Sequence, residues 1–287
     1  MTLDACDLCT GDLKPYRHAW LRRCAACSSL RADLPVEIPA QAGGSALDEA
    51  LRETGLEAVR RINNTRLLDA LSRLAPSGCT LLDVGCGPGF LLDAARKRGF
   101  TPLGLEPDGN VVEAAGRRGA PVRQGYFPQA LEAGETFEII VFNDVLEHIP
   151  ALDAALAAGA MHLQPGGLLL VNCPDRRGLF FRVAAIADRL GLSGAYDRLW
   201  QRGLPSPHVW YLSPSALTAA TARHGLVAVD GPVRLKTVAL KGLWSRIRYV
   251  KGQPLVLSLA AFVFSVATQP LARLFPADAS AMVFRRG

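Results

Sequence analysis

The sequence predicts an α/β fold, a doubly wound, mostly parallel sheet with helices on both faces. Strand-like apolar runs alternate along the chain with helix-like segments. The run LLDVGCGPGF at 81–90 joins one strand to a helix through a glycine-rich turn. The runs FEIIVF and GLLLV lack alternation, as expected of strands buried on both faces. A parallel sheet that carries a ligand loop accounts for all three observations.

The glycine-rich turn is the most informative feature of the chain. Two leucines run into Asp83, and glycines follow at alternate positions, Gly85, Gly87 and Gly89. Such glycines permit positive φ and let a ligand approach the main chain with no Cβ in the way. The dinucleotide fingerprint requires a third glycine at position 90, where Phe90 stands. The turn therefore indicates a ligand cradle, and a nicotinamide ligand is disfavoured.

A second acid stands at the end of the next strand-like run. Glu106 follows Asp83 by 23 positions, where a doubly wound fold places an acid that accepts the ribose hydroxyls. Together the two signals resemble class I S-adenosylmethionine-dependent methyltransferases, which have a Rossmann-like fold. The alternative is a glycine turn of an α/β protein with another ligand. The resemblance implies S-adenosylmethionine as cofactor, held by Asp83, Gly85, Cys86, Gly87, Gly89, Glu106 and Pro107.

The resemblance extends over most of the remaining chain. Residues 137–150 match the family's fourth strand and following loop, 163–174 its fifth strand, and 281–286 its last strand. Helices are predicted at 151–163 and 212–226, the second with Ser213 as N-cap and Gly225 as its stop. By the resemblance Gln124, Gly125 and Tyr126 flank the adenine, although no acid stands at 123–126, and Asn143 lies beside the methionine portion.

The N-terminus carries two cysteine pairs, Cys6-x2-Cys9 and Cys24-x2-Cys27, with fourteen residues between them. This spacing can place four thiolates around one tetrahedral ion, and it resembles a zinc ribbon. Four thiolates leave no open coordination position, so the Zn²⁺ would be structural. Disulfides are the alternative, but the N-terminus lacks a signal-peptide pattern, which favours a reducing, cytoplasmic location. Thr10 and Ser28 stand where such knuckles usually carry glycine.

Three regions are expected from these signals. Residues 1–32 form the zinc-ribbon-like module, 33–75 a linker and lid helices, and 76–287 the methyltransferase domain, with an apolar helical insertion at about 240–276. The proline- and glycine-containing segment 31–46 has no periodicity and is typical of a linker. The run at 47–74 has helical spacing and predicts one or two helices over the cofactor edge of the sheet. The cysteines outside the ribbon, Cys79, Cys86 and Cys173, are interpreted as small apolar residues.

The segment NDVLEHI is the second place where chemistry is expected. Asp144, Glu147 and His148 have the spacing of one helical face. The same spacing occurs in ubiquinone-biosynthesis O-methyltransferases, where it resembles a divalent-metal site, but it also occurs in metal-independent relatives. We therefore disfavour a metal at Asp144, Glu147 and His148. His148 is a candidate general base oriented by Glu147, and a histidine bonded to backbone is the structural alternative.

His208, in SPHVWYLS, is the third catalytic candidate beside Glu147 and His148. In relatives a histidine followed by an aromatic residue often faces the substrate pocket at this place. Trp210 and Tyr211 can line the same pocket, although two aromatic residues against a helix end also suit a core.

The C-terminal third offers a clue to the acceptor. No charged residue occurs from Gly252 to Ala272, and a helix between Pro254 and Pro270 would be about 22 Å long, shorter than the roughly 30 Å hydrocarbon core. A transmembrane span is therefore disfavoured. The preceding run KGLWSRIRYVKG mixes basic and aromatic residues of the kind found at anionic membrane surfaces. We expect peripheral membrane contact through residues 241–275, and a hairpin packed on the protein or on a second copy is the alternative.

Composition leaves more than one function open. The net charge of +6 suits nucleic acid and anionic membranes equally. The preferred prediction is methyl transfer to a small-molecule acceptor, a sugar or a lipid-linked or isoprenoid compound similar to substrates of sugar and ubiquinone-biosynthesis methyltransferases. A ribosomal RNA or other RNA methyltransferase with a zinc ribbon is the runner-up, because the ribbon has few basic and aromatic residues. An inactive methyltransferase-like scaffold is the third alternative, and no pattern sets the oligomeric state.

Overall fold

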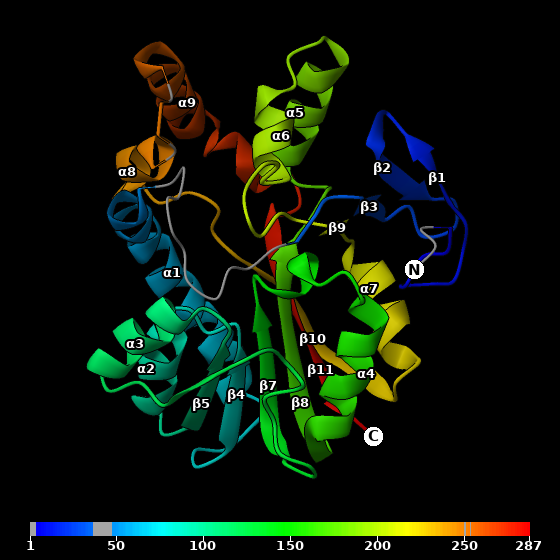
Figure 1. Ribbon diagram of the computed structural model, residues 1–287, viewed down its shortest axis with the longest axis vertical. Helices are drawn as coiled ribbons and strands as arrows, with labels where there is room; N and C mark the ends of the chain where they lie inside the picture. The colour runs from blue at the N-terminus through cyan, green and yellow to red at the C-terminus, as the bar shows by residue number, and fades with distance from the viewer. Residues whose placement is uncertain (1–3, 37–47, 250, 253) are drawn as a thin grey trace.

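The computed structural model describes residues 4–36, 48–249, 251–252 and 254–287 of the chain. Its centre is a seven-stranded sheet in the order β10-β11-β8-β7-β4-β5-β6 (Figure 1). The strands are β4 (Thr80–Val84), β5 (Thr101–Glu106), β6 (Val122–Gln124), β7 (Phe137–Asn143), β8 (Leu163–Pro174), β10 (Leu226–Arg234) and β11 (Ala279–Arg286). Neighbouring strands from β8 to β6 pair in parallel, and β11 is antiparallel to β8 and β10. The predicted fold is confirmed.

The strand order reverses at β4. This strand pairs with β5 on one side and with β7 on the other, so the chain continues first toward one edge of the sheet and then toward the other. In open α/β sheets ligands bind outside the carboxyl ends of the strands at such a switch point. The glycine loop after β4 and the NDVLEHI loop after β7 therefore meet at one edge of the sheet.

Helices cover both faces of this sheet, as its continuous apolar strands require. One face packs against α1 (Glu49–Ser72) and α2 (Phe90–Arg96), through a core that includes Leu67, Leu71 and Leu91. The other face packs against α4 (Leu152–His162) and α7 (Pro214–Ala222), through Leu156 and Leu217. Helix α3 (Gly109–Arg117) lies beyond β5. The region 47–74 thus holds one long helix in its described part.

The second helix prediction is confirmed with shorter bounds. Ser213 caps α7, since its hydroxyl accepts a hydrogen bond from the Ala216 N–H at 3.2 Å. Gly225 has φ +71°, a conformation that favours glycine, and β10 begins at the next residue. The predicted helix at 212–226 therefore loses residues at both ends.

A small sheet at the N-terminus contains β1 (Leu13–Tyr16), β2 (His18–Cys24) and β3 (Leu30–Ala32). Its fourth strand is β9 (Trp210–Tyr211), which comes from the predicted region 76–287 and pairs with β3. Residues 31 and 32, predicted as the start of a linker, belong instead to β3. Residues 37–46 of that predicted linker lie outside the described residues.

Two helical segments project past the carboxyl ends of the parallel strands (Figure 1). The first is α5 (Leu179–Arg189) with α6 (Gly194–Leu199), and it packs on the small sheet through Phe181, Tyr196 and Trp200. The second is the predicted insertion, which contains α8 (Leu243–Arg248), α9 (Leu255–Thr268) and the short 3-10 turn η2 (Leu271–Leu274). Helix α8 lies against α1 (Figure 1). Within the described part of the chain, no helix is long and apolar enough to cross a membrane.

Candidate functional site

The glycine loop follows β4 directly, and each glycine has positive φ. A Cβ at Gly85 would lie 2.7 Å from Val145 Cγ2, and one at Gly89 would lie 2.9 Å from the Ala120 Cβ. Within 4 Å of a Cβ at Gly87 there is no atom among the described residues. The first and third glycines therefore serve packing, whereas Gly87 leaves an open place where a ligand can reach the backbone.

Glu106 lies across the loop from Gly87. Its Oε2 accepts a hydrogen bond from the Gly87 N–H at 3.0 Å, and Oε1 accepts one from the Asp108 N–H at 3.1 Å. This places the carboxylate at the end of β5, beside the turn, where the resemblance expects the ribose hydroxyls. Pro107 follows it, and its carbonyl lies 3.5 Å from Gln124 Nε2.

Asp83 is buried at the end of β4. Only 2% of the residue is exposed, and Oδ1 has no hydrogen-bond partner among the described residues. Burial, with a smaller contribution from Glu106, raises the pKa of Asp83 to about 8. An unpartnered carboxyl of this kind fits a cationic ligand, because the ligand's charge would favour the ionised form.

The side chain of Cys86 is buried, and its thiol donates to the Gly87 carbonyl at 3.6 Å. It packs in a small apolar cluster with Leu92, Ala115 and Ala120, and it lies close to Gly104 of β5. The thiol of Cys86 is thus engaged in packing, and the cofactor contact predicted for this residue would come from its backbone.

The predicted adenine side lies at the end of β6. Gln124, Gly125 and Tyr126 line a shallow depression of about 620 Å³ together with Phe127, Gln129 and Ala130. Tyr126 is about half exposed. The depression opens beside Glu106, because the Gly125 N–H donates to the Glu106 carbonyl at 3.0 Å.

The end of β7 carries a polar cluster that the sequence only partly indicated. Asn172 of β8 donates from Nδ2 to Asn143 Oδ1 at 2.8 Å and to Asp144 Oδ1 at 2.9 Å. Asp144 has φ +58°. Burial raises the pKa of its carboxyl, and the charges of Arg60 and Arg246 oppose that rise. Arg60 comes from α1 and Arg246 from α8, so both flanking helices face this loop.

Glu147, His148 and His208 come together, and their possible ligand atoms lie within 4.8 Å of one another. His208 Nε2 is 3.9 Å from Glu147 Oε1, and the two imidazole rings are 4.7 Å apart. Burial and the nearby Asp144 raise the pKa of Glu147 well above its usual range. Burial, and secondly His148, lower the pKa of His208 well below its usual range. Glu147 thus favours its protonated form and His208 its neutral form.

The hydrogen bonds of the two histidines fix their tautomers. His148 Nδ1 lies 2.9 Å from the Pro207 carbonyl oxygen, which can only accept, so Nδ1 carries the proton. The lone pair of His148 is then on Nε2. Gln201 Nε2, a donor, lies 2.9 Å from His208 Nε2, which therefore accepts.

This cluster differs from the metal set weighed in the sequence. His208 replaces Asp144 as the third member beside Glu147 and His148, and Asp144 instead accepts a hydrogen bond from Asn172. One carboxylate and two imidazoles form a donor set that suits a divalent cation. Glu147 Oε2 is buried with no hydrogen-bond partner in the described chain, so the place suits a cation or a polar acceptor group.

The four N-terminal cysteines are brought together as predicted. Their Sγ atoms lie within 4.8 Å of one another, with Cys6 3.7 Å from Cys27 and Cys9 3.4 Å from Cys24. All four are free thiols. Thr10 and Ser28 both have positive φ, near +60°, so the two knuckles keep the backbone that glycine would usually provide. The donor set and its geometry fit a Zn²⁺ ion.

Hydrogen bonds connect this module to the NDVLEHI loop after β7. The Val209 N–H donates to the Glu147 carbonyl at 2.8 Å, and the Ala32 N–H donates to the Val209 carbonyl at 2.9 Å. Asp7 Oδ2, beside the first knuckle, accepts from the Leu152 N–H at the start of α4 at 3.1 Å. Strand β3 thus supports the segment that carries His208.

Sequence reasoning missed several residues of this site, among them Asn172, Gln201, Arg60 and Arg246. Asn172 had a signal, since it is the single polar side chain in the buried run LLLVNC. Arg246 was grouped with surface residues, whereas its guanidinium donates to the Thr237 carbonyl and is densely surrounded. Only the packing of α8 on α1 turns this side chain inward.

Comparison with known families decides the assignment. The family profile described as "Methyltransferase domain" matches residues 56–230, more than half of the chain. The chain belongs to this methyltransferase family. It is a class I S-adenosylmethionine-dependent methyltransferase.

Curated relatives carry a more specific name. The methyltransferase is 28% identical over 184 residues to the "Ubiquinone biosynthesis O-methyltransferase" of Methylobacterium sp. (strain 4-46), covering 60% of this chain and 69% of that protein. It is 28% identical over 187 residues to the protein of the same name from Caulobacter vibrioides, covering 62% of this chain and 71% of the relative.

Solved structures share the fold. The cyclopropane synthase MmaA2 from Mycobacterium tuberculosis superposes with a TM-score of 0.55 at 18% identity, covering 77% of this chain and 82% of that one. The putative sarcosine dimethylglycine methyltransferase from Galdieria sulphuraria gives 0.54 at 15% identity, covering 89% and 94%. At this identity the likeness shows the fold alone.

Proposed function

We propose that this methyltransferase transfers a methyl group to a hydroxyl of a small-molecule acceptor, a lipid-linked, isoprenoid or sugar compound. The observation that carries the proposal is His148, whose tautomer leaves a lone pair on Nε2 at the switch-point edge of the sheet that also bears the glycine loop. The names of the curated relatives support an oxygen acceptor on a small molecule.

The protein's part in this reaction is alignment and proton transfer. S-adenosylmethionine supplies an activated methyl group, so little covalent help is needed. Asp83, Glu106 and the Gly87 backbone would hold the cofactor, and the Gln124–Tyr126 segment would contact its adenine side. His148 would take the proton of the acceptor hydroxyl, while the Pro207 carbonyl keeps its ring oriented.

His208 and Glu147 would assist this base. A neutral His208 beside His148 avoids a second positive charge, and protonated Glu147 can donate a hydrogen bond to the acceptor. We place both among the catalytic candidates on these grounds, with Asn143 and Asn172 orienting the loop.

We further propose that the four N-terminal cysteines hold a structural Zn²⁺ ion. The support is their mutual distance and the matching backbone of the two knuckles. Four thiolates complete a tetrahedral shell, so this ion would not take part in the reaction.

An RNA acceptor receives less support. Two ribbon arginines are engaged inside the protein. Arg17 donates to the Ala185 carbonyl at 2.7 Å, and Arg31 donates to the Ala32 carbonyl and lies over the Trp210 ring. The ribbon sheet itself is paired to β9. These contacts favour a supporting module over a nucleic-acid grip.

The test of the proposal uses methyl-labelled S-adenosylmethionine and a fractionated lysate of the source organism. We expect label in the organic or sugar-containing extract, and label confined to RNA would overturn the proposal. With the labelled fraction as substrate, His148→Ala should reduce kcat by about 10²-fold or more with S-adenosylmethionine affinity unchanged. His162→Ala, on the last turn of α4, is the matched control.

Treatment with a chelator distinguishes a general-base role of His148 from binding of a divalent cation at the same cluster. With His148 as base, activity should survive EDTA treatment at a concentration that leaves the zinc content unchanged. Loss of activity under EDTA, with recovery on adding Mg²⁺ or Mn²⁺, would assign the cluster of Glu147, His148 and His208 to a divalent cation instead.

A further inference from the structure

Helix α9 exposes an unusual amount of apolar surface. Of its 14 residues only Ser258 is buried. Leu255, Val256, Leu257, Leu259 and Val263 are between 49% and 76% exposed. At 100° per residue, the exposed positions cover more than half of the helix circumference, while Ser258, Ala261, Phe262 and Ser265 face the protein. Exposed apolar patches of this size mark interaction sites.

A second element adds to this surface. Ile186, Leu190 and Leu192, at the end of α5 and in the turn after it, are between 56% and 75% exposed. The two elements are neighbours, because the Phe180 and Phe264 rings lie 6.0 Å apart. Figure 1 shows both helices rising at the same end of the molecule. We call the exposed apolar residues of α9 and of the α5 turn the apolar end.

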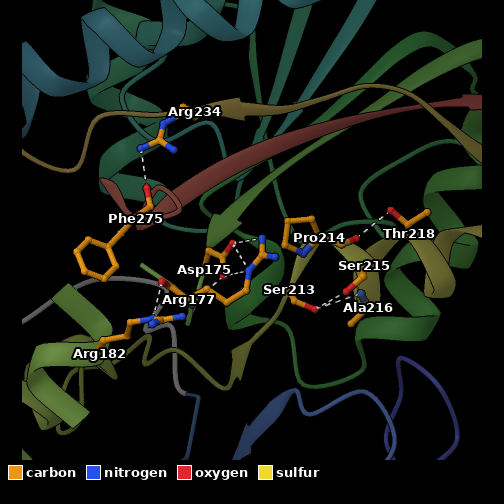
Figure 2. Close-up of polar contacts among 10 residues, drawn as sticks. All are labelled: Asp175, Arg177, Arg182, Ser213, Pro214, Ser215, Ala216, Thr218, Arg234 and Phe275. Carbon is orange, nitrogen blue, oxygen red and sulfur yellow. Dashed lines mark hydrogen bonds and ion pairs between the residues drawn. The ribbon is translucent and has the colours of Figure 1, made fainter. Parts of the chain in front are cut away.

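The apolar end is firmly anchored at its base. Arg234 of β10 donates to the Phe275 carbonyl at 2.8 Å, and the guanidinium of Arg182 lies 5.8 Å from the Phe275 ring (Figure 2). Trp244 of α8 and Phe262 of α9 pack edge to face with ring centres 6.0 Å apart. The ring contact of Phe262 holds the inner face of α9, and the Phe275 contacts hold the segment after η2, so the outer face of α9 stays exposed.

The charges around the apolar end select the partner. From Gly231 to Ala277 the chain contains no acidic residue and seven basic ones, and the exposed ones are Arg234, Lys236, Lys241, Lys251 and Arg273. Arg182 and Arg189 of α5 are exposed as well. A second copy docked on the same face would bring these cations together, since a two-fold interface pairs a patch with itself. An anionic bilayer offers both lipid tails for the apolar side chains and negative headgroups for the basic ones.

We propose that the apolar end docks the methyltransferase on an anionic membrane surface, with α9 lying in the interface plane. At 14 residues, α9 is about 21 Å long and fits along the headgroup boundary. The register places the docking face near the site, because Ala279, at the start of β11, pairs with Pro174 at the carboxyl end of β8. Docking therefore turns the edge that carries the cofactor loop toward the bilayer.

The test is cosedimentation of the full chain with phosphatidylcholine vesicles that contain a minority of phosphatidylglycerol. We expect binding that weakens as salt rises, and at least about tenfold weaker binding to vesicles of phosphatidylcholine alone. The double variant Val256→Glu/Val263→Glu should weaken binding at least about tenfold. Both side chains are exposed, so circular dichroism and Tm should not change.

The matched control is Val227→Glu on β10, where a valine that is 64% exposed lies outside the apolar end. It should bind vesicles like the wild type. The charge variant Lys241→Glu/Arg273→Glu should lose the preference for phosphatidylglycerol. Absence of vesicle binding, or equal loss in the Val227→Glu control, would overturn the proposal. So would concentration-dependent dimerisation abolished by Val256→Glu/Val263→Glu, since a second copy would then cover the apolar end.

Discussion

Single residues of the glycine loop differ in what they contact, although the sequence shows them as one repeated glycine pattern. Gly85 and Gly89 fit against Val145 and Ala120, whereas Gly87 leaves open space. Gly104 of β5 is a further packing glycine, since a Cβ there would lie 2.4 Å from Cys86 Sγ. Packing and ligand binding can therefore be separated by alanine substitutions.

Gly87→Ala should weaken S-adenosylmethionine binding at least about tenfold while costing only about 1 kcal/mol of stability, the usual cost of alanine at positive φ. Gly104→Ala should instead lower the stability by about 1–3 kcal/mol through overpacking. Isothermal titration and thermal unfolding measure the two effects. Equal losses of Tm in both variants would contradict the separation of roles.

We expect Asp83 to lower the stability of the ligand-free protein and to strengthen S-adenosylmethionine binding. Its pKa is about 8 in the folded protein and near 3.8 when unfolded. Between these values the folded state retains a proton that the unfolded state releases, so stability is lost as pH rises toward 8. Since one pKa unit corresponds to about 1.4 kcal/mol, Asp83→Asn should stabilise the ligand-free protein by up to about 5 kcal/mol near pH 9 and by about 2 kcal/mol near pH 5.

The same substitution should weaken S-adenosylmethionine binding by about tenfold, because it removes the negative charge that attracts the ligand's positive groups. Thermal unfolding at several pH values and titration calorimetry measure both effects. Asp69→Asn on α1, a half-exposed carboxylate, is the control. A stability gain independent of pH would show that Asp83 is ionised throughout.

Helix α8 of the insertion packs closely on helix α1 at two glycines. A Cβ at Gly55 of α1 would lie 2.4 Å from the backbone nitrogen of Arg246, and Gly242, at the start of α8, approaches the Thr54 carbonyl. Gly55→Ala should push α8 off α1 and withdraw Arg246 from Asp144. Hydrogen exchange of residues 243–248 should then rise at least about tenfold, which corresponds to 1.4 kcal/mol of local opening.

Gly116→Ala on α3 is the control for that substitution. It also places alanine in a helix, but no atom among the described residues lies within 4 Å of the new Cβ. It should raise stability by up to about 1 kcal/mol. If Gly55→Ala left exchange in α8 unchanged, the close approach of the two helices would not determine the position of the insertion.

The sequence indicated the elements whose signals are local. The glycine loop, the apolar strands and the Ser213 cap each follow from residues adjacent in the chain, and they are found where expected. Elements and contacts that form only with residues far away in the sequence were not predicted. Strand β9 is only two residues long and exists because β3 pairs with it, so its pattern cannot be recognised locally. The meeting of His208 with Glu147 depends on this same pairing, which fixes Val209 against the NDVLEHI loop.

For the whole molecule, the N-terminal module and the methyltransferase sheet form one hydrogen-bonded structure. The Leu8 and Asp7 carbonyls accept from Arg223 beside α7, the Asp7 carboxylate meets the start of α4, and β3 continues into β9. These contacts reach Glu147 and His208, which we propose as the acceptor side of the site. They do not involve the glycine loop or Glu106, which lie toward the other edge of the sheet.

Loss of the proposed Zn²⁺ should therefore affect methyl transfer more than cofactor binding. Cys24→Ser should lower the zinc content to near zero and reduce kcat about tenfold or more, because a misplacement of about 1 Å at a site can cost 10²-fold. S-adenosylmethionine affinity should change by less than about threefold. Hydrogen exchange should rise in residues 206–212, where β9 and His208 lie.

Cys79→Ser is the matched control, since Cys79 is a buried thiol of the sheet core outside the cysteine cluster. It should keep its zinc, its kcat and the slow exchange of residues 206–212. If Cys24→Ser lost zinc but retained full kcat, the ribbon would not position the catalytic loop. If Cys24→Ser lost cofactor affinity in parallel with kcat, the ribbon would affect both sides of the site. The proposal that the ribbon supports only the acceptor side would then be wrong.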